Sequence, residues 1–108
     1  IDDPRVEIKI IQFPQAADVS PTNTEFYQVL SGVLKELVPQ GICTPMLTPG
    51  TTDSCFFRRK GVKAYGLFPA IIDPGELARF HGIDERLSFE NLRLGTETIY
   101  RVLQKMTQ

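Results

Sequence analysis

The sequence is poor in side chains that bind transition metals, with one histidine and two cysteines among 108 residues. A catalytic zinc ion needs three protein ligands, and neither H-E-x-x-H nor C-x-x-C occurs, so we expect no complete zinc site from this chain alone. Two cysteines are also too few for a disulfide framework. We therefore expect Cys43 and Cys55 to be reduced and the protein to be cytoplasmic, with a secreted or vacuolar location as the alternatives.

An excess of positive charge and long apolar runs are missing as well. The 12 basic and 13 acidic residues give a formal net charge of −1, which argues against nucleic acid as a partner. No segment approaches the roughly 20 apolar residues of a membrane-spanning helix, so we expect no membrane partner. The start, residues 1–4, lacks both an initiator methionine and the features of a signal peptide. We expect the chain to begin inside a longer protein.

The hydrophobic fraction of 42% is ordinary for a globular protein. The length of 108 residues indicates one domain or part of one. Apolar residues recur at helical spacing from Phe26 to Leu37. Before them, Thr22 and Glu25 have the spacing of a capping box. Shorter helices are predicted over 53–60 and 74–80, and a last helix over 89–105. The residues of this last helix expected to face inward are Leu92, Ile99, Val102, Leu103 and Met106.

Three segments have the pattern of strands. Residues 5–13 alternate between apolar and polar side chains, whereas 42–47 and 62–68 are short apolar runs typical of inner strands. The mixed order of strands and helices predicts an α/β fold. Two inner strands make an incomplete sheet, so we expect other sequence or another subunit to complete it. We also expect the isolated chain to self-associate through exposed strands.

The strongest single candidate for a metal ligand is His81. It follows a short predicted helix and precedes Gly82, and Asp84 and Glu85 lie close by in sequence. Glycine allows close backbone approach, and a neighbouring carboxylate can orient an imidazole. The alternative for a lone histidine is an ordinary surface or structural role.

The second candidate is the loop Gly50-Thr51-Thr52-Asp53-Ser54, because backbone amides at a helix start bind carboxylates or phosphates. The alternative needs no ligand: Thr52 is then the N-cap and Asp53 stabilises the first turn. A nucleophilic pair of Cys55 and His81 is the weakest interpretation, because we expect Cys55 to be buried on the short helix.

Three strings carry a family resemblance: Pro49-Gly50-Thr51-Thr52-Asp53-Ser54-Cys55-Phe56-Phe57, Tyr65-Gly66-Leu67-Phe68-Pro69 and Phe80-His81-Gly82-Ile83-Asp84-Glu85-Arg86-Leu87-Ser88. Their order and spacing resemble the C-terminal third of the di-zinc aminoacylase, carboxypeptidase S and succinyl-diaminopimelate desuccinylase family. The resemblance covers nearly the whole chain. It implies a partial α/β/α sandwich, with 1–13 as the last strand of an inserted lid or dimerisation domain. Residues 14–108 would be the C-terminal part of the catalytic domain.

The resemblance also implies roles for single residues. His81 matches the family's last metal ligand and Glu85 the acidic residue that supports it, whereas Gly50 and Thr51 match the loop that contacts the substrate carboxylate. Cys55 departs from the family pattern, in which arginine is frequent at that position. The remaining metal ligands and the general-base glutamate would lie upstream, so no catalytic residue is expected within this chain.

The implied protein is a fragment of a zinc-dependent exopeptidase or amidohydrolase, with two zinc ions in the full-length parent. It would hydrolyse the amide bond of small peptides or N-acyl amino acids, and the fragment by itself would be inactive. The alternative, from another functional class, is a non-catalytic remnant or protein-interaction module with the same fold.

Overall fold

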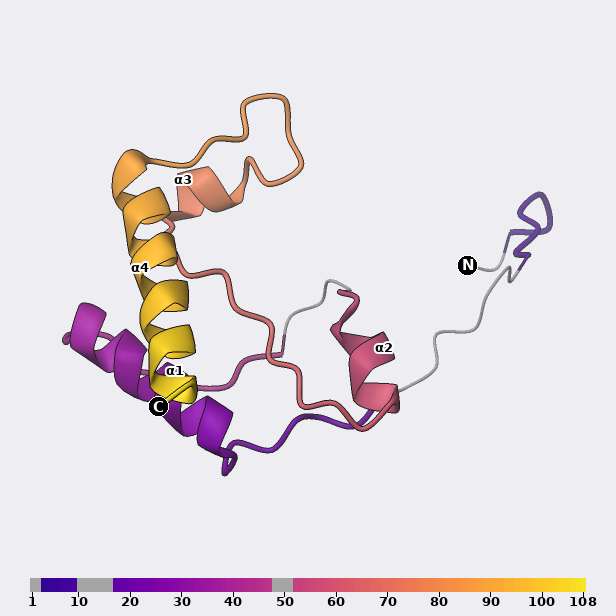
Figure 1. Ribbon diagram of the computed structural model, residues 1–108. Coiled ribbons are helices and arrows are strands. Elements are labelled where there is room, and N and C mark those ends of the chain that lie inside the picture. Colours follow the sequence, from indigo (N-terminus) through magenta and orange to yellow (C-terminus); the bar gives the residue numbers. More distant parts are fainter. Residues whose placement is uncertain (1–2, 10–16, 48–51) are drawn as a thin grey trace.

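The computed structural model describes residues 3–9, 17–47 and 52–108 of the chain. In these residues it contains four helices: α1 (Glu25–Leu37), α2 (Ser54–Arg59), α3 (Pro74–Leu77) and α4 (Phe89–Met106). Long non-helical segments connect them (Figure 1). Within the same residues, no helix combines the length and the hydropathy that a membrane crossing requires.

The predicted partial α/β/α sandwich is wrong, because the described ranges contain helices and no strand. Residues 42–47 and 62–68 have no regular secondary structure. Residues 3–9 begin with a turn, in which the Val6 amide donates to the Asp3 carbonyl at 3.0 Å. The rest of the first predicted strand and the predicted domain boundary at 13/14 lie outside the described residues. Strands need hydrogen bonds to a neighbouring strand, and the described segments form no such ladder.

The four predicted helices are confirmed, but α3 ends at Leu77, three residues before its predicted end at residue 80, and α2 and α4 differ from their predicted bounds by single residues. The N-cap of α1 is Thr24, whose hydroxyl accepts the Tyr27 amide at 3.2 Å, so the predicted capping box beginning at Thr22 is wrong. Asp73 caps α3 as predicted and accepts two backbone amides, at 2.7 and 2.9 Å. These side chains satisfy amides that have no partner within the helix.

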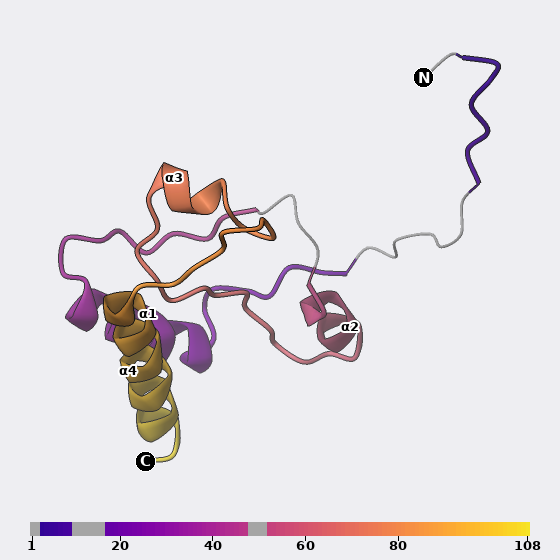
Figure 2. The ribbon, with the colours of Figure 1, turned by 90° about the horizontal axis from the view of Figure 1, so that it is seen from above.

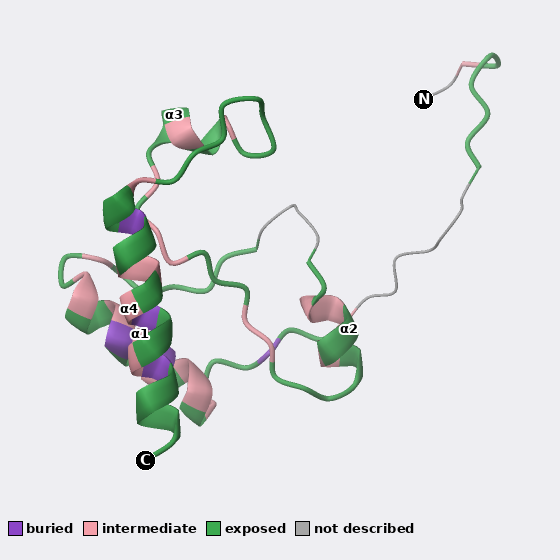
Figure 3. Cartoon of the chain, turned by 45° about the horizontal axis from the view of Figure 1, so that its top comes forward, coloured by how far each residue is buried: buried purple, intermediate pink, exposed green. Residues whose placement is uncertain are grey.

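The core lies where α1 crosses α4, as two views of the molecule show (Figures 1 and 2). Leu30, Val33 and Val102 are buried there, and partly buried side chains of α1 surround them. Thr98 is fully buried and donates its hydroxyl hydrogen to the Leu94 carbonyl at 2.8 Å. The buried apolar residues all lie at this crossing (Figure 3), whereas the buried polar residues Ser20 and Asn91 lie elsewhere, so the core is small for a chain of this length.

Only one of the five α4 residues expected to face inward is buried, namely Val102 at 4% exposure. The other four are between 39% and 60% exposed: Leu92, Ile99, Leu103 and Met106. On α4 the buried side chains are Asn91, Thr98 and Val102, which recur at intervals of seven and four. The prediction erred because α4 is apolar over a wider arc than α1 can cover.

Ion pairs hold the outer edge of the α1–α4 crossing. Glu36 accepts a hydrogen bond from Lys105 at 2.6 Å and lies 3.7 Å from Arg101. Arg101 also pairs with Glu97, one turn earlier on α4, at 2.6 Å. The hydrogen bond from Lys105, reinforced by its charge, lowers the pKa of the Glu36 carboxyl below its ordinary value. The network therefore stabilises the helix crossing while Glu36 is ionised.

Two side chains hold the segment between α2 and α3 by binding both backbone groups of one residue. The buried Ser20 hydroxyl donates to the Ala64 carbonyl and accepts the Ala64 amide, each at 3.0 Å. The buried Asn91 amide does the same for Ile71, with both distances 2.9 Å. We call these pairs of bonds the Ser20 clamp and the Asn91 clamp. Each clamp satisfies one backbone amide and one backbone carbonyl, the groups that would pair with a neighbouring strand in a sheet.

Candidate functional site

The candidate metal ligand, His81, lies in a tight turn after α3. Its backbone has φ 61°, which is the left-handed region and is unusual for a residue with a side chain. The next residue closes the turn, since the Gly82 amide donates to the Arg79 carbonyl at 2.8 Å. A Cβ at position 82 would lie 2.9 Å from that carbonyl oxygen, so glycine is required there. The turn leaves His81 exposed.

The two carboxylates of this turn have different partners. Glu85 accepts the backbone amide of His81 at 3.2 Å, so it fixes the main chain that carries the imidazole. Asp84 instead pairs with Arg86 at 3.3 Å and with Arg79 at 3.8 Å. Glu85 therefore supports the His81 turn, whereas Asp84 forms exposed ion pairs with two arginines.

The turn is attached to the body of the molecule through Phe80. Its ring packs edge-on against Phe68, with centroids 5.5 Å apart. The Asn91 clamp on Ile71 fixes the backbone between Phe68 and α3. Sequence reasoning missed both Asn91 and Ser20. The only local signal for Asn91 is its position three residues after Ser88, the N-cap of α4.

The other predicted binding residues, Gly50 and Thr51, lie outside the described residues, so their proximity to His81 stays a prediction. Just after them, the Thr52 hydroxyl accepts the Ser54 amide at 3.3 Å. The N-cap position of α2 belongs to Asp53, which makes no side-chain capping bond. Cys55 is half-buried on α2 with a free thiol, and the structure shows no hydrogen bond between Cys55 and His81.

A second polar cluster lies at the start of α1, where the Tyr65 hydroxyl donates to the Pro21 carbonyl at 2.6 Å and contacts the Thr24 hydroxyl at 2.5 Å. The Tyr27 ring packs against Tyr65 with centroids 5.4 Å apart. Burial, reinforced by the nearby Cys43 thiol, raises the pKa of Tyr27. This cluster contains no imidazole or carboxylate that could act as a base, so its role is to attach the 17–24 segment to Tyr65.

A metal site requires several histidine, cysteine, aspartate or glutamate side chains close together. Within residues 3–9, 17–47 and 52–108, no three side chains of histidine, cysteine, aspartate or glutamate come together in a group that could hold a metal ion. The exposed imidazole of His81 fits one ligand position, and a catalytic zinc requires three protein ligands. The described residues therefore do not make a metal site, and His81 could act only with ligands from elsewhere.

Comparison with known proteins gives a family. Residues 5–105 match the family model described as Peptidase family M20/M25/M40. The N-fatty-acyl-amino acid synthase/hydrolase PM20D1 of Homo sapiens is 27% identical over 107 residues, which are 96% of this chain and 21% of that protein. For PM20D1.1 of Danio rerio, which has the same description, the identity is 30% over 93 residues, 84% of this chain and 18% of that protein.

A relative with a different description is the probable carboxypeptidase S-like 2 of Dictyostelium discoideum. It is 27% identical over 105 residues, which are 96% of this chain and 20% of that protein. The chain thus spans about a fifth of the length of these relatives. No solved structure matches the chain. Because the family match extends over residues 5–105 and includes His81 and its turn, this chain belongs to the peptidase family M20/M25/M40.

Proposed function

We propose that this chain is the C-terminal part of a zinc-dependent hydrolase that cleaves the amide bond of N-acyl amino acids. The observation that carries the proposal is the family match over residues 5–105, together with relatives described as N-fatty-acyl-amino acid synthase/hydrolases. The relative described as a carboxypeptidase supports small peptides as a second substrate class. Both classes present an amide next to a carboxylate.

The proposal gives the residues of this chain limited and separate roles. His81 supplies one imidazole ligand from an exposed turn. Glu85 keeps the main chain of that turn in place through its bond to the His81 amide and so orients the ligand indirectly. Gly50 and Thr51 contact the substrate carboxylate. When bound, zinc would polarise the amide carbonyl and activate water, with its other ligands drawn from outside the described residues.

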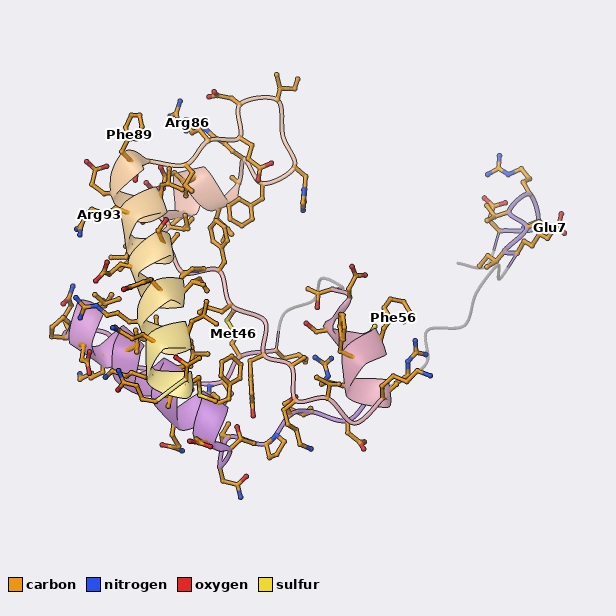
Figure 4. The ribbon with its side chains drawn as sticks, in the orientation of Figure 1. Glu7, Met46, Phe56, Arg86, Phe89 and Arg93 are labelled. Atoms are coloured by element: carbon orange, nitrogen blue, oxygen red, sulfur yellow. The ribbon has the colours of Figure 1, made fainter. Side chains whose placement is uncertain are left out.

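The test is hydrolysis by the complete polypeptide encoded by the gene, with a panel of N-acyl amino acids and dipeptides. We expect turnover that a chelator abolishes and added zinc restores, with faster cleavage of N-acyl amino acids. His81→Ala should remove activity, whereas Arg93→Ala should not, because Arg93 lies exposed on α4 and projects away from the core (Figure 4). A folded, zinc-loaded protein without turnover across the panel would instead support a non-catalytic remnant.

A further inference from the structure

Ile83 lies two positions after His81 and is the only large apolar residue of the turn 81–86. Its relative exposure of 109% is the highest among the large apolar residues of the described ranges, and the chain between α3 and α4 loops away from the helix crossing (Figure 1). Single exposed apolar residues are common on protein surfaces, so the position of Ile83 matters more than its exposure. Two residues of backbone span at most about 7 Å, which keeps Ile83 near any group that the His81 imidazole binds.

The backbone of this turn is closed on both sides of Ile83. Before it, the Gly82 amide donates to the Arg79 carbonyl at 2.8 Å, and a Cβ at position 82 would lie 2.9 Å from the same oxygen. After it, the Glu85 carboxylate accepts the His81 amide at 3.2 Å. These bonds fix the separation between residues 81 and 83, so the isoleucine stays close to the imidazole while the turn is intact.

The acidic side chains of the turn have protein partners. Asp84 pairs with Arg86 at 3.3 Å and with Arg79 at 3.8 Å, and Glu85 binds a backbone amide. The turn therefore offers a substrate one side chain that can bind a metal ion, the imidazole, and one apolar side chain, the isoleucine.

An N-acyl amino acid, the substrate class proposed above, can meet the isoleucine with either of two ends. Its carboxylate would lose hydration there without gaining a hydrogen-bond partner, which is costly. A long acyl chain would instead be stabilised by the contact, because burial of apolar surface is favourable. The relatives described as N-fatty-acyl-amino acid synthase/hydrolases are, by that description, enzymes for amides with such a chain.

We propose that Ile83 is a specificity-determining residue, which contacts the acyl chain of the substrate and favours long apolar acyl groups over acetyl. This inference rests on the proposed function, because it takes His81 as a ligand of the metal ion at which the amide is cleaved. The competing neighbour of Ile83 is the remaining part of the polypeptide, against which the side chain would pack in a purely structural role.

The experiment compares kcat/KM of the complete polypeptide encoded by the gene for N-acyl leucines that differ only in the acyl chain, from acetyl to palmitoyl. We expect Ile83→Ala to lower the value for the palmitoyl substrate at least about tenfold, the effect of a missing methylene contact, and to leave the acetyl substrate unchanged. Ile83→Leu should restore the preference, since it keeps an aliphatic side chain of the same size. Val19→Ala, at a residue that is 86% exposed and distant in sequence from His81, should change neither value.

Binding is measured on the same proteins, so that the test does not depend on turnover. The probe is N-palmitoyl leucine with a CH2 group in place of the amide nitrogen, which cannot be hydrolysed, and its acetyl counterpart is the reference. Isothermal titration calorimetry should give a dissociation constant for the palmitoyl probe at least about tenfold higher in Ile83→Ala than in the wild type. The acetyl probe and the zinc content should be unaffected.

Equal loss of kcat/KM at every chain length in Ile83→Ala, or no loss at any, would overturn the inference. A lower unfolding temperature without a change in chain-length preference would also overturn it and would identify the remaining polypeptide as the neighbour of Ile83. A wild type without turnover would remove the proposed function alone if Ile83→Ala still weakened binding of the palmitoyl probe selectively. Equal binding of that probe by the wild type and Ile83→Ala would remove the acyl contact.

Discussion

The Asn91 clamp offers the sharpest test of how the site is positioned. Its side chain is 8% exposed and accepts the Ile71 amide while donating to the Ile71 carbonyl, both at 2.9 Å. Asn91→Ala removes both bonds without altering the α4 backbone. Because Ile71 as a residue is 62% exposed, water can partly replace the lost partners after local opening. The free energy lost in Asn91→Ala should therefore equal that of two ordinary hydrogen bonds. It should be smaller than the penalty for two fully buried groups without partners.

Each hydrogen bond is worth about 0.5–1.5 kcal/mol, so the loss amounts to about 1–3 kcal/mol. If the Ile71 amide exchanges through local opening, its hydrogen exchange should accelerate roughly 5- to 150-fold, since about 1.4 kcal/mol corresponds to a factor of ten. Asn91→Asp should have a smaller effect on this amide. It keeps the acceptor for the amide and adds a negative charge in the first turn of α4, worth about 0.3–1 kcal/mol, while it loses the donor to the carbonyl.

The assay is amide hydrogen exchange followed by nuclear magnetic resonance, with Arg93→Ala as the control for general effects on α4. We expect the Ile71 amide to exchange faster in Asn91→Ala than in the wild type. In Asn91→Asp the increase in its exchange rate should be smaller. An Ile71 exchange rate unchanged in Asn91→Ala would refute the reasoning. Equal acceleration of the core amides of α1 would refute it as well, because it would mean that the variant unfolds the helix crossing as a whole.

Three further changes test other parts of the structure. Ser20→Ala should destabilise the fold by about 1–3 kcal/mol, measured by urea denaturation, because it leaves both backbone groups of Ala64 without their partner. Gly95→Val should lower the unfolding temperature, since its Cβ meets the Pro69 carbonyl at 3.3 Å; Gly95→Ala should be nearly neutral, because a helix propensity gain of about 0.5–1 kcal/mol offsets the crowding. Glu36→Gln should lower stability at neutral pH and make it less sensitive to acid, because the ionised carboxyl pairs with lysine and arginine.

The sign of the acid effect follows from the lowered pKa of Glu36. A carboxyl whose pKa is lower in the folded state adds stability that is complete above its ordinary value of 4.5 and is lost as the pH falls through the folded value. The urea midpoint of the wild type should therefore drop below pH 4.5 by more than that of Glu36→Gln. Glu7→Gln, an exposed residue distant in sequence from both helices, serves as the control. Parallel pH profiles for the wild type and Glu36→Gln would contradict the role of the network.

The helices could be predicted from the sequence because their hydrogen bonds and caps are local. The apolar spacing from Phe26 to Leu37 placed α1 almost to the residue, and the Asp73-Pro74 pair placed the start of α3, although α3 ends three residues earlier than predicted. The cap of α1 was misassigned because Thr22 and Thr24 are both good caps and the backbone conformation decides between them. Thr24 has the extended conformation of an N-cap.

The strand predictions over 42–47 and 62–68 were wrong, because a strand depends on a partner that its own sequence does not contain. Residues 42–47 and 62–68 have suitable apolar patterns, yet within the second run the Ser20 side chain binds the backbone of Ala64, and just beyond it Asn91 binds the backbone of Ile71. No local pattern shows that a serine and an asparagine bind backbone 44 and 20 residues away.

Local chemistry singled out His81 and the loop at 50–54, but only the family resemblance gave them specific roles. A lone exposed histidine carries little signal, and the bond between Glu85 and the His81 amide has no sequence signature. The comparisons confirm the family over residues 5–105, while the metal role of His81 stays a prediction. Geometry adds that the turn requires glycine at position 82 and holds His81 at φ 61°, a conformation that costs energy in an ordinary loop.

The most direct test of the central claim, that His81 is a metal ligand of an M20 hydrolase, is the zinc content of the complete polypeptide with and without His81→Ala. Elemental analysis of the purified, folded proteins should give about two zinc ions for the wild type and about one for the variant, with hydrolysis of N-acyl amino acids lost. Full zinc occupancy together with full activity in His81→Ala would contradict the ligand assignment.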